Sequence, residues 1–303
     1  MFPRSKRKTH RDSEGFTLIE MAVVLVIAGM IIMAVFPALI ASRKANQLAV
    51  TQSNLQTLMR ATASFVQANG CLPCPAKPGG TRTSFGFMGY DSTATRCGAC
   101  NAPQGIPPFV ALGVSSSVAH DGWGHWITMR VDPALTNLAN VVVPPTASCT
   151  ASDVASGAYG CTTVGASVKG LCMAASSSNN SALSGVKVTS VTLSGLGATQ
   201  YAAVLFLSHG STGYGSYVAT TKISDYLRPF DSRFHACNPP TNGFAQCNSA
   251  EVNSGQFYDA PIIQNDADAS ESAALDFYDD LLAYASRNAL ISMLGNGACS
   301  SEW

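Results

Sequence analysis

An apolar run from Phe16 to Ile40 constrains this chain more than any other feature. Glu20 is its only charged residue. At a rise of about 1.5 Å per residue, a helix of this length can cross the hydrocarbon core of a bilayer. The run is longer than a buried helix of a soluble protein needs, and basic residues precede it. We therefore predict that residues 16–40 form a membrane-spanning helix.

The segment before this run predicts its orientation. Residues 1–15 carry five Lys or Arg residues against Asp12 and Glu14. Basic residues beside a membrane helix stay in the cytoplasm, so the rest of the chain is expected to be exported. A secretory signal would place a cleavage site after a shorter apolar core. Here the change of character lies before the run, at Gly15, which has no Cβ and can lie extended in a protease cleft.

Glu20 is unusual because it lies one turn inside the apolar run. A carboxylate at that depth costs about 2.5–3.5 kcal/mol on insertion scales, so it calls for a cationic partner. A cut after Gly15 would give Phe16 an α-amino group on the same helix face, at the positive end of the helix dipole. That amine could neutralise Glu20 within one chain or between neighbouring chains. In the alternative interpretation, Glu20 reaches the lipid headgroups.

The sequence from Gly15 to Glu20, between a basic leader and an apolar helix, resembles the N-terminus of type IV prepilins and type II secretion pseudopilins. The resemblance implies that prepilin peptidase cuts between Gly15 and Phe16 and N-methylates Phe16. It also implies that Glu20 pairs with the Phe16 amine of an adjacent subunit during filament assembly. Pro37 stands where many of these proteins carry a helix-kinking proline, and a proline removes one backbone donor from a helix.

The helix is expected to continue past the apolar run. Arg43 and Lys44 mark its exit from the membrane, and Asn69-Gly70 is a typical C-terminal stop. Between them, apolar residues recur at helical spacing and predict a face that packs on a folded domain: Leu48, Leu55, Leu58, Met59, Phe65 and Val66. We predict four segments: a removed leader at 1–15, a transmembrane half of the helix at 16–40, an amphipathic half at 41–70 and an exported globular domain at 71–303.

Ten cysteines follow the helix, and export would place them in an oxidising compartment, which favours disulfides. Their pairing does not follow from spacing. Two Cys-x-x-Cys pairs leave open a four-thiolate zinc site made of Cys71, Cys74, Cys97 and Cys100. A redox pair is the weaker alternative, because the negative helix end before Cys71 would raise a thiol pKa. The disulfide candidates are Cys71, Cys74, Cys97, Cys100, Cys149, Cys161, Cys172, Cys237, Cys247 and Cys299.

The exported part is expected to be rich in strands and loops. Residues 121–124 read Asp-Gly-Trp-Gly, which predicts a tight turn that starts a strand. The turn resembles one in many pseudopilins, where the tryptophan packs against the long helix. Metal binding by His120 and His125 is the alternative, but no further ligand follows at suitable spacing. Strands are predicted at 186–193 and, more apolar and therefore central, at 201–208. Residues 146–182 read as a loop-rich insertion.

Two further stretches carry candidate chemistry. His209 lies beside Ser208 and near Ser211, but adjacent residues rarely form a nucleophile and its base, so a glycine-rich turn is the preferred interpretation. A helix is predicted from Leu275 to Leu294. Acidic residues in and before its first turn are expected to be solvated, and their spacing is not that of a calcium loop, although calcium binding stays open: Asp266, Asp268, Glu271, Asp276, Asp279 and Asp280.

Together these features predict an α+β, pilin-like protein, with a long N-terminal helix packed on an antiparallel sheet, disulfide-stapled loops and a C-terminal helix. The expected function is structural, as a minor pilin or pseudopilin that assembles through its N-terminal helix into a type IV pilus or type II secretion pseudopilus. It would lie in the bacterial inner membrane with its domain in the periplasm, and later in a filament.

The expected partners are prepilin peptidase, other pilin subunits, the inner-membrane assembly machinery and, before assembly, membrane lipid. We expect no enzymatic activity and no cofactor. Without the leader the chain has a net charge of −3, which argues against binding nucleic acid. Two alternatives stay open: an adhesin displayed on a pilus, and, less favoured, a membrane-anchored hydrolase.

Overall fold

The computed structural model describes helix α1 and parts of the chain that follows it. The described residues are 18–69, 71–78, 86–88, 98, 100–136, 148, 150–156, 163–165, 186–192, 195–217, 247–248, 255–262 and 278–294. The leader and Phe16 lie outside them. By its internal contacts the chain divides into two compact units, Met1–Asn46 and Gln47–Trp303.

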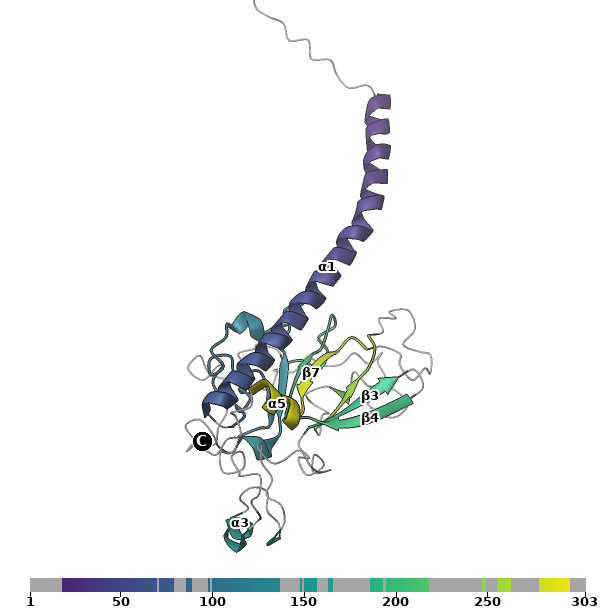
Figure 1. Ribbon diagram of the computed structural model, residues 1–303. Coiled ribbons are helices and arrows are strands. Elements are labelled where there is room, and N and C mark those ends of the chain that lie inside the picture. The colour runs from purple at the N-terminus through teal and green to yellow at the C-terminus, as the bar shows by residue number, and fades with distance from the viewer. Residues whose placement is uncertain are drawn as a thin grey trace, which may run out of the picture. The chain divides into compact units, whose positions relative to one another are not determined.

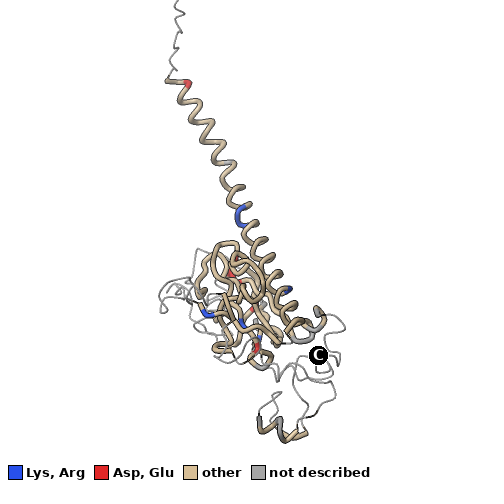
Figure 2. The backbone as a smooth tube through the Cα atoms, turned by 90° about the vertical axis from the view of Figure 1, so that its left-hand side faces the viewer, with Lys and Arg blue, Asp and Glu red and all other residues tan. Residues whose placement is uncertain are grey.

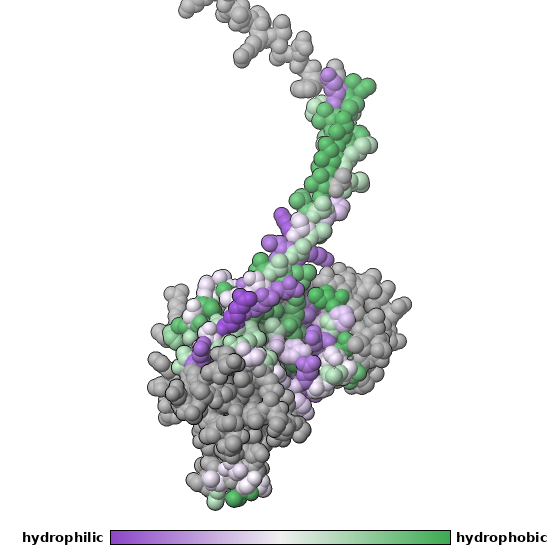
Figure 3. All heavy atoms as spheres, in the orientation of Figure 1, coloured by the Kyte–Doolittle hydropathy of each residue, from purple (hydrophilic) through white to green (hydrophobic). Residues whose placement is uncertain are grey.

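Helix α1 runs without interruption from Leu18 to Asn69 and contains Pro37 (Figure 1). Both its continuity and its end at Asn69 confirm the sequence prediction. The face of its first half that Figure 3 shows is mostly apolar, and the exposed large side chains there include Leu25, Ile32 and Phe36. Figure 2 shows no charge along this half between the acidic residue at its start and the basic residues farther along. By length and composition, α1 can cross a membrane, and it is the one such helix among the described residues.

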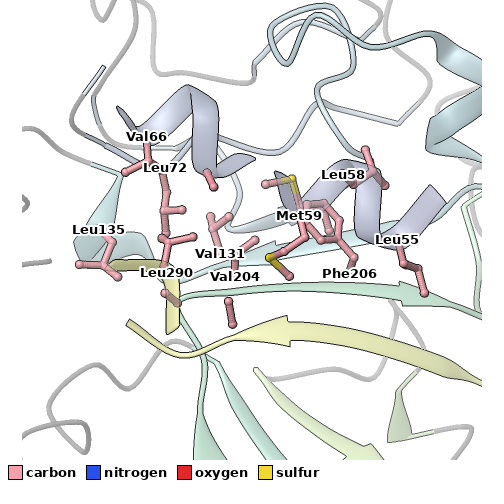
Figure 4. Close-up of a cluster of buried hydrophobic side chains, with 14 of the residues drawn as sticks. Leu55, Leu58, Met59, Val66, Leu72, Val131, Leu135, Val204, Phe206 and Leu290 are labelled. Carbon is pink, nitrogen blue, oxygen red and sulfur yellow. The ribbon is translucent and has the colours of Figure 1, made fainter. Parts of the chain in front are cut away.

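The second half of α1 packs its apolar face on a sheet of the domain that follows it. Leu55, Leu58, Met59 and Val66 are buried there, together with Phe206 of the sheet (Figure 4). These helix positions are those that the apolar spacing predicted. Burying each such side chain contributes roughly 1.5–3 kcal/mol, so the contact fixes this half of the helix to the domain.

The sheet under α1 has four strands in the order β1-β2-β5-β7, and all its pairs are antiparallel. The strands are β1 (Gln104–Gly105), β2 (Thr128–Val131), β5 (Val204–Ser208) and β7 (Leu281–Ala285). Every residue of β5 is buried, and β5 lies between β2 and β7. The prediction that this strand is central is therefore confirmed.

The predicted helix from Leu275 to Leu294 is wrong over its middle. Residues Leu281–Ala285 form β7, and within the described part of the predicted helix, residues 278–294, the helical residues are Arg287–Leu294 of α5. A short apolar run fits a strand as well as a helix by its pattern alone. Here the strand is favoured because β7 pairs along the whole of β5, from Val204 opposite Ala285 to Ser208 opposite Leu281.

A second sheet has three strands in the order β4-β3-β6. These are β3 (Lys187–Thr192), β4 (Gly195–Tyr201) and β6 (Gln256–Asp259). The pair β3–β4 is antiparallel, whereas β3 and β6 are parallel, so the expectation of purely antiparallel pairing is wrong for this sheet. The sequence predicted β3 but gave no signal for β4 or β6.

Short helices complete the described structure. The two 3₁₀ turns are η1 (Ser116–Ala119) and η2 (Pro133–Leu135), and the one described element in the predicted loop region 146–182 is helix α3 (Ala151–Ser156).

Disulfides join the segments that follow α1. Cys74 is bonded to Cys100, and Cys71 and Cys247 are also disulfide-bonded. A disulfide sulfur is not a thiolate, so disulfides replace the alternative zinc site at Cys71, Cys74, Cys97 and Cys100. Cys71 and Cys74 are fully buried, which also disfavours a redox role. Six of the predicted disulfide residues lie outside the described part of the chain: Cys97, Cys149, Cys161, Cys172, Cys237 and Cys299.

The turn at residues 121–124 starts β2, as predicted, and packs directly on α1. The Gly122 N–H donates to Thr51 Oγ1 at 2.9 Å, and the Thr51 hydroxyl donates to the Gln47 carbonyl at 2.8 Å. The Asn54 side chain donates to the His120 carbonyl at 2.8 Å. The contact thus depends on Gly122, because a Cβ at this position would overlap the backbone of Gln47. The packing of Trp123 on the helix stays a prediction.

Replacing Gly122 with Ala should therefore loosen α1 from the domain. The new methyl group meets a backbone carbonyl that cannot move cheaply, and overpacking of this kind costs about 1–3 kcal/mol. Urea unfolding of the full chain in detergent measures this loss. Gly29→Ala is the matched control, because a Cβ there meets nothing within 4 Å. Equal unfolding free energies for the two variants would contradict the assigned contact.

Candidate functional site

The first half of α1 is the largest functional surface that the structure offers. Its large apolar side chains are exposed, with Leu18 at 89% and Met33 at 82% exposure. Glu20 lies in the first turn, where the positive end of the helix dipole stabilises a carboxylate. Pro37 lies inside the helix, and the processing residues Gly15 and Phe16 lie outside the described residues. This surface suits a lipid environment or the apolar faces of other helices, but not water.

Comparison with known protein families identifies this segment. Residues 10–36 match the model of the prokaryotic N-terminal methylation motif. This chain carries the type IV pilin and pseudopilin signature. The signature implies a pilin-type protein that prepilin peptidase processes and that assembles with other pilin subunits. No curated protein and no solved structure matches the chain.

The domain that follows α1 contains a second candidate, a buried polar cluster where the 121–124 turn meets the ends of two strands. Asp121 organises the turn, since its Oδ1 accepts from the N–H groups of Trp123 and His125 at 3.0 and 2.8 Å. Its other oxygen, Oδ2, accepts from the Ser208 hydroxyl at 2.8 Å. The cluster therefore links the turn on α1 to the end of β5.

The geometry of His209 does not support the catalytic alternative. His209 Nε2 lies 3.1 Å from Thr128 Oγ1, and Nδ1 lies 3.9 Å from Asp280 Oδ1. The Ser208 hydroxyl is bonded to Asp121, and the Ser211 hydroxyl donates to Asp279 at 3.0 Å. Neither serine is therefore activated by His209. The glycine-rich turn is confirmed, because Gly210, Gly213 and Gly215 all have positive φ.

The acids at the start of β7 differ from the prediction of solvated charge. Asp279 and Asp280 are 2% and 4% exposed. Asp279 accepts from the Thr212 N–H at 2.9 Å, and Asp280 accepts from the Asn248 amide at 2.9 Å. Burial raises the pKa of both carboxyls. Sequence reasoning missed Asn248, for which no local pattern gives a signal.

The calcium and histidine metal hypotheses gain no support from the described residues. Within the described ranges, no group of three or more His, Cys, Asp or Glu side chains is placed to hold a metal ion. His120 and His125 are partly buried, as the preferred interpretation expected, and the His120 ring packs on Trp126 with centroids 3.7 Å apart. The other four acids of the predicted cluster lie outside the described residues: Asp266, Asp268, Glu271 and Asp276.

Burial gives His209 a strongly shifted titration. Desolvation lowers its pKa to about 3, against a raising effect of Asp121 and a further lowering effect of His125. The folded state therefore keeps this imidazole neutral, whereas the unfolded chain protonates it below a pH of about 6.5. Stability from this group is present above pH 6.5 and is lost as the pH falls towards 3.

The variant His209→Gln should remove this acid sensitivity. Between pH 6 and 4 the wild type should lose up to about 1.4 kcal/mol of unfolding free energy per pH unit relative to the variant. The slopes, rather than the absolute stabilities, are compared, because the substitution also changes packing. His120→Gln serves as the control and should keep the wild-type slope. Parallel pH profiles for wild type and His209→Gln would contradict the assignment.

Proposed function

We propose that this chain is a structural subunit, a minor pilin or pseudopilin, that assembles into a type IV pilus or a type II secretion pseudopilus. In this proposal prepilin peptidase cuts after Gly15 and N-methylates Phe16. The observation that carries it is the methylation motif at residues 10–36, on a helix whose first half exposes only apolar side chains and Glu20. The size of the exported part, residues 71–303, favours a minor rather than a major subunit.

The proposed cycle follows from the two halves of α1. Residues 16–40 span the inner membrane before assembly, with the N-terminus in the cytoplasm and the domain in the periplasm. The same side chains then pack against equivalent helices in the filament, so the apolar surface stays out of water in both states. Residues 41–70 hold the domain to this helix. The compact division at Asn46 and Gln47 falls within this second half and supports the idea that the two halves serve different surroundings.

Glu20 supplies the specificity of this assembly. A carboxylate within a membrane or a bundle of apolar helices is costly unless a cation meets it. The free amine of a processed Phe16 on the neighbouring subunit is such a cation. At a separation of about 4 Å the pair gains roughly 1 kcal/mol in water and about 4 kcal/mol where the effective dielectric constant is near 20. The pair therefore sets the axial register of each incoming subunit.

A structural rather than enzymatic role fits the exported domain. Its polar cluster holds hydroxyl and carboxyl groups in mutual hydrogen bonds, in which the Ser208 hydroxyl donates to Asp121 and the Ser211 hydroxyl donates to Asp279. The motif is also that of a structural family. The described cluster therefore serves to fix the turn, β5 and β7 relative to one another.

Replacing Glu20 with Leu should separate insertion from assembly. Removing the charge makes membrane insertion more favourable, so the variant should appear in the membrane fraction at the wild-type level or above. Its recovery in sheared filaments should fall at least tenfold, because the amine of the next subunit loses its partner. Met21→Leu is the matched control, since it changes the adjacent position without changing charge and should assemble normally. Wild-type assembly of Glu20→Leu would remove the proposed role of Glu20.

A further inference from the structure

We propose that a groove between the second half of α1 and the start of β7 binds an extended polypeptide segment that carries a basic side chain. The segment would add as a strand to the edge of β7. This inference goes beyond the proposed function, because the groove lies in the exported domain and involves no residue of the N-terminal motif.

The groove has the size of a binding site. Its volume is about 470 Å³, within the range of roughly 300–1,000 Å³ that is typical of ligand sites. Helix α1, the end of β6 and the start of β7 each form one side. The described residues that line it are Gln52, Leu55, Gln56, Asp259, Ala260, Ile262, Asp280, Leu281, Leu282 and Ala283.

The lining shows that the groove follows the edge of β7. It contacts four consecutive residues, 280–283, whereas successive side chains of a strand point to opposite faces. Leu281 and Ala283 pack towards the cluster under α1, and Leu282 packs with the opposite cluster. A cavity that touches both sets must lie beside the strand and not over one of its faces.

This edge is open within the described structure. Strand β7 ends the order β1-β2-β5-β7, and β5 is its one partner among the described strands. Every second residue of an edge strand directs its N–H and C=O groups outward, where another strand can pair with them. At about 3.4 Å per residue, β7 offers room for three to five residues of a bound segment.

The charge of the groove selects the occupant. Asp259 and Asp280 both line the groove, and no Lys or Arg of the described ranges does. The Asp280 carboxyl is buried and accepts from Asn248, so the half-buried Asp259 is the carboxyl that a bound cation would meet. The Asp259 carboxyl is partly shielded from water, and this burial raises its pKa. A nearby cation would stabilise its charged form. Ile262, which is 45% exposed, adds an apolar contact. An anionic lipid headgroup would be repelled, and a second copy of this chain brings a net charge of −3 after processing.

The test uses the full chain in detergent micelles and a fluorescein-labelled, end-blocked peptide of sequence Thr-Val-Lys-Val-Thr, with fluorescence anisotropy as the readout. Three comparison peptides isolate the two parts of the proposal. One carries Glu in place of Lys, and the other two carry N-methyl groups on alternate backbone nitrogens, one peptide for each of the two phases. Binding should fall at least tenfold for the Glu peptide and for at least one N-methylated phase, because the charge or the strand hydrogen bonds are lost.

Variants of the chain locate the binding. Ile262→Lys and Asp259→Asn should each weaken the lysine peptide at least tenfold, while Met293→Lys, at a 52% exposed position of α5 that does not line the groove, should leave it unchanged. The proposal would be overturned if the Glu peptide bound as tightly as the lysine peptide. It would also be overturned if both N-methylated peptides bound as tightly as the unmodified lysine peptide. Self-association of the chain that Ile262→Lys abolishes, without any binding of the lysine peptide, would overturn it as well, because the occupant would then be a second copy.

Discussion

One helix has to satisfy two environments, and the rest of the molecule follows from that requirement. The first half of α1 exposes almost only apolar side chains, while the second half buries an apolar face on the four-stranded sheet. The sheet excludes water from the apolar face of the second half. No described residue of its own unit covers the first half, so that half needs lipid or other helices. Glu20, in the first turn, is the single charged residue in the apolar run, so the N-terminal end of this surface differs from the rest of it.

The domain that follows α1 holds the second half of this helix firmly. Gly122 brings the turn into contact with the backbone of Gln47, and Asp121 joins the same turn to Ser208 at the end of β5. From there the buried cluster reaches Asp280 and the start of β7. The turn that contacts α1 is therefore linked to the sheet by hydrogen bonds, and the apolar face of α1 is held to the sheet by packing. A helix under axial load in a filament would need both.

The sequence predicted the helix and its buried face better than it predicted the domain. A long apolar run, a basic leader and a helical repeat of apolar residues are local signals, and they correctly gave α1, its end at Asn69 and its buried face. The central strand β5 was also predictable from its continuous apolar residues. The apolar pattern of Leu281–Ala285 fits a helix as well as a strand. Pairing with β5 makes it a strand, and β5 lies far away in the sequence, so no local signal shows this pairing. For the same reason β4, β6 and the burial of Asp279 and Asp280 had no local signal, and neither did the groove beside β7.

We propose that this chain becomes an assembly subunit through a cut on the cytoplasmic side of its apolar run. The most direct test is the mass of the mature N-terminal peptide from membrane-extracted protein, with Gly15→Arg as the comparison. We expect the wild-type chain to begin at Phe16 with a single methyl group on its amine, and Gly15→Arg to keep the leader. A wild-type chain that begins at Met1, or at a site beyond Ala41, would contradict it.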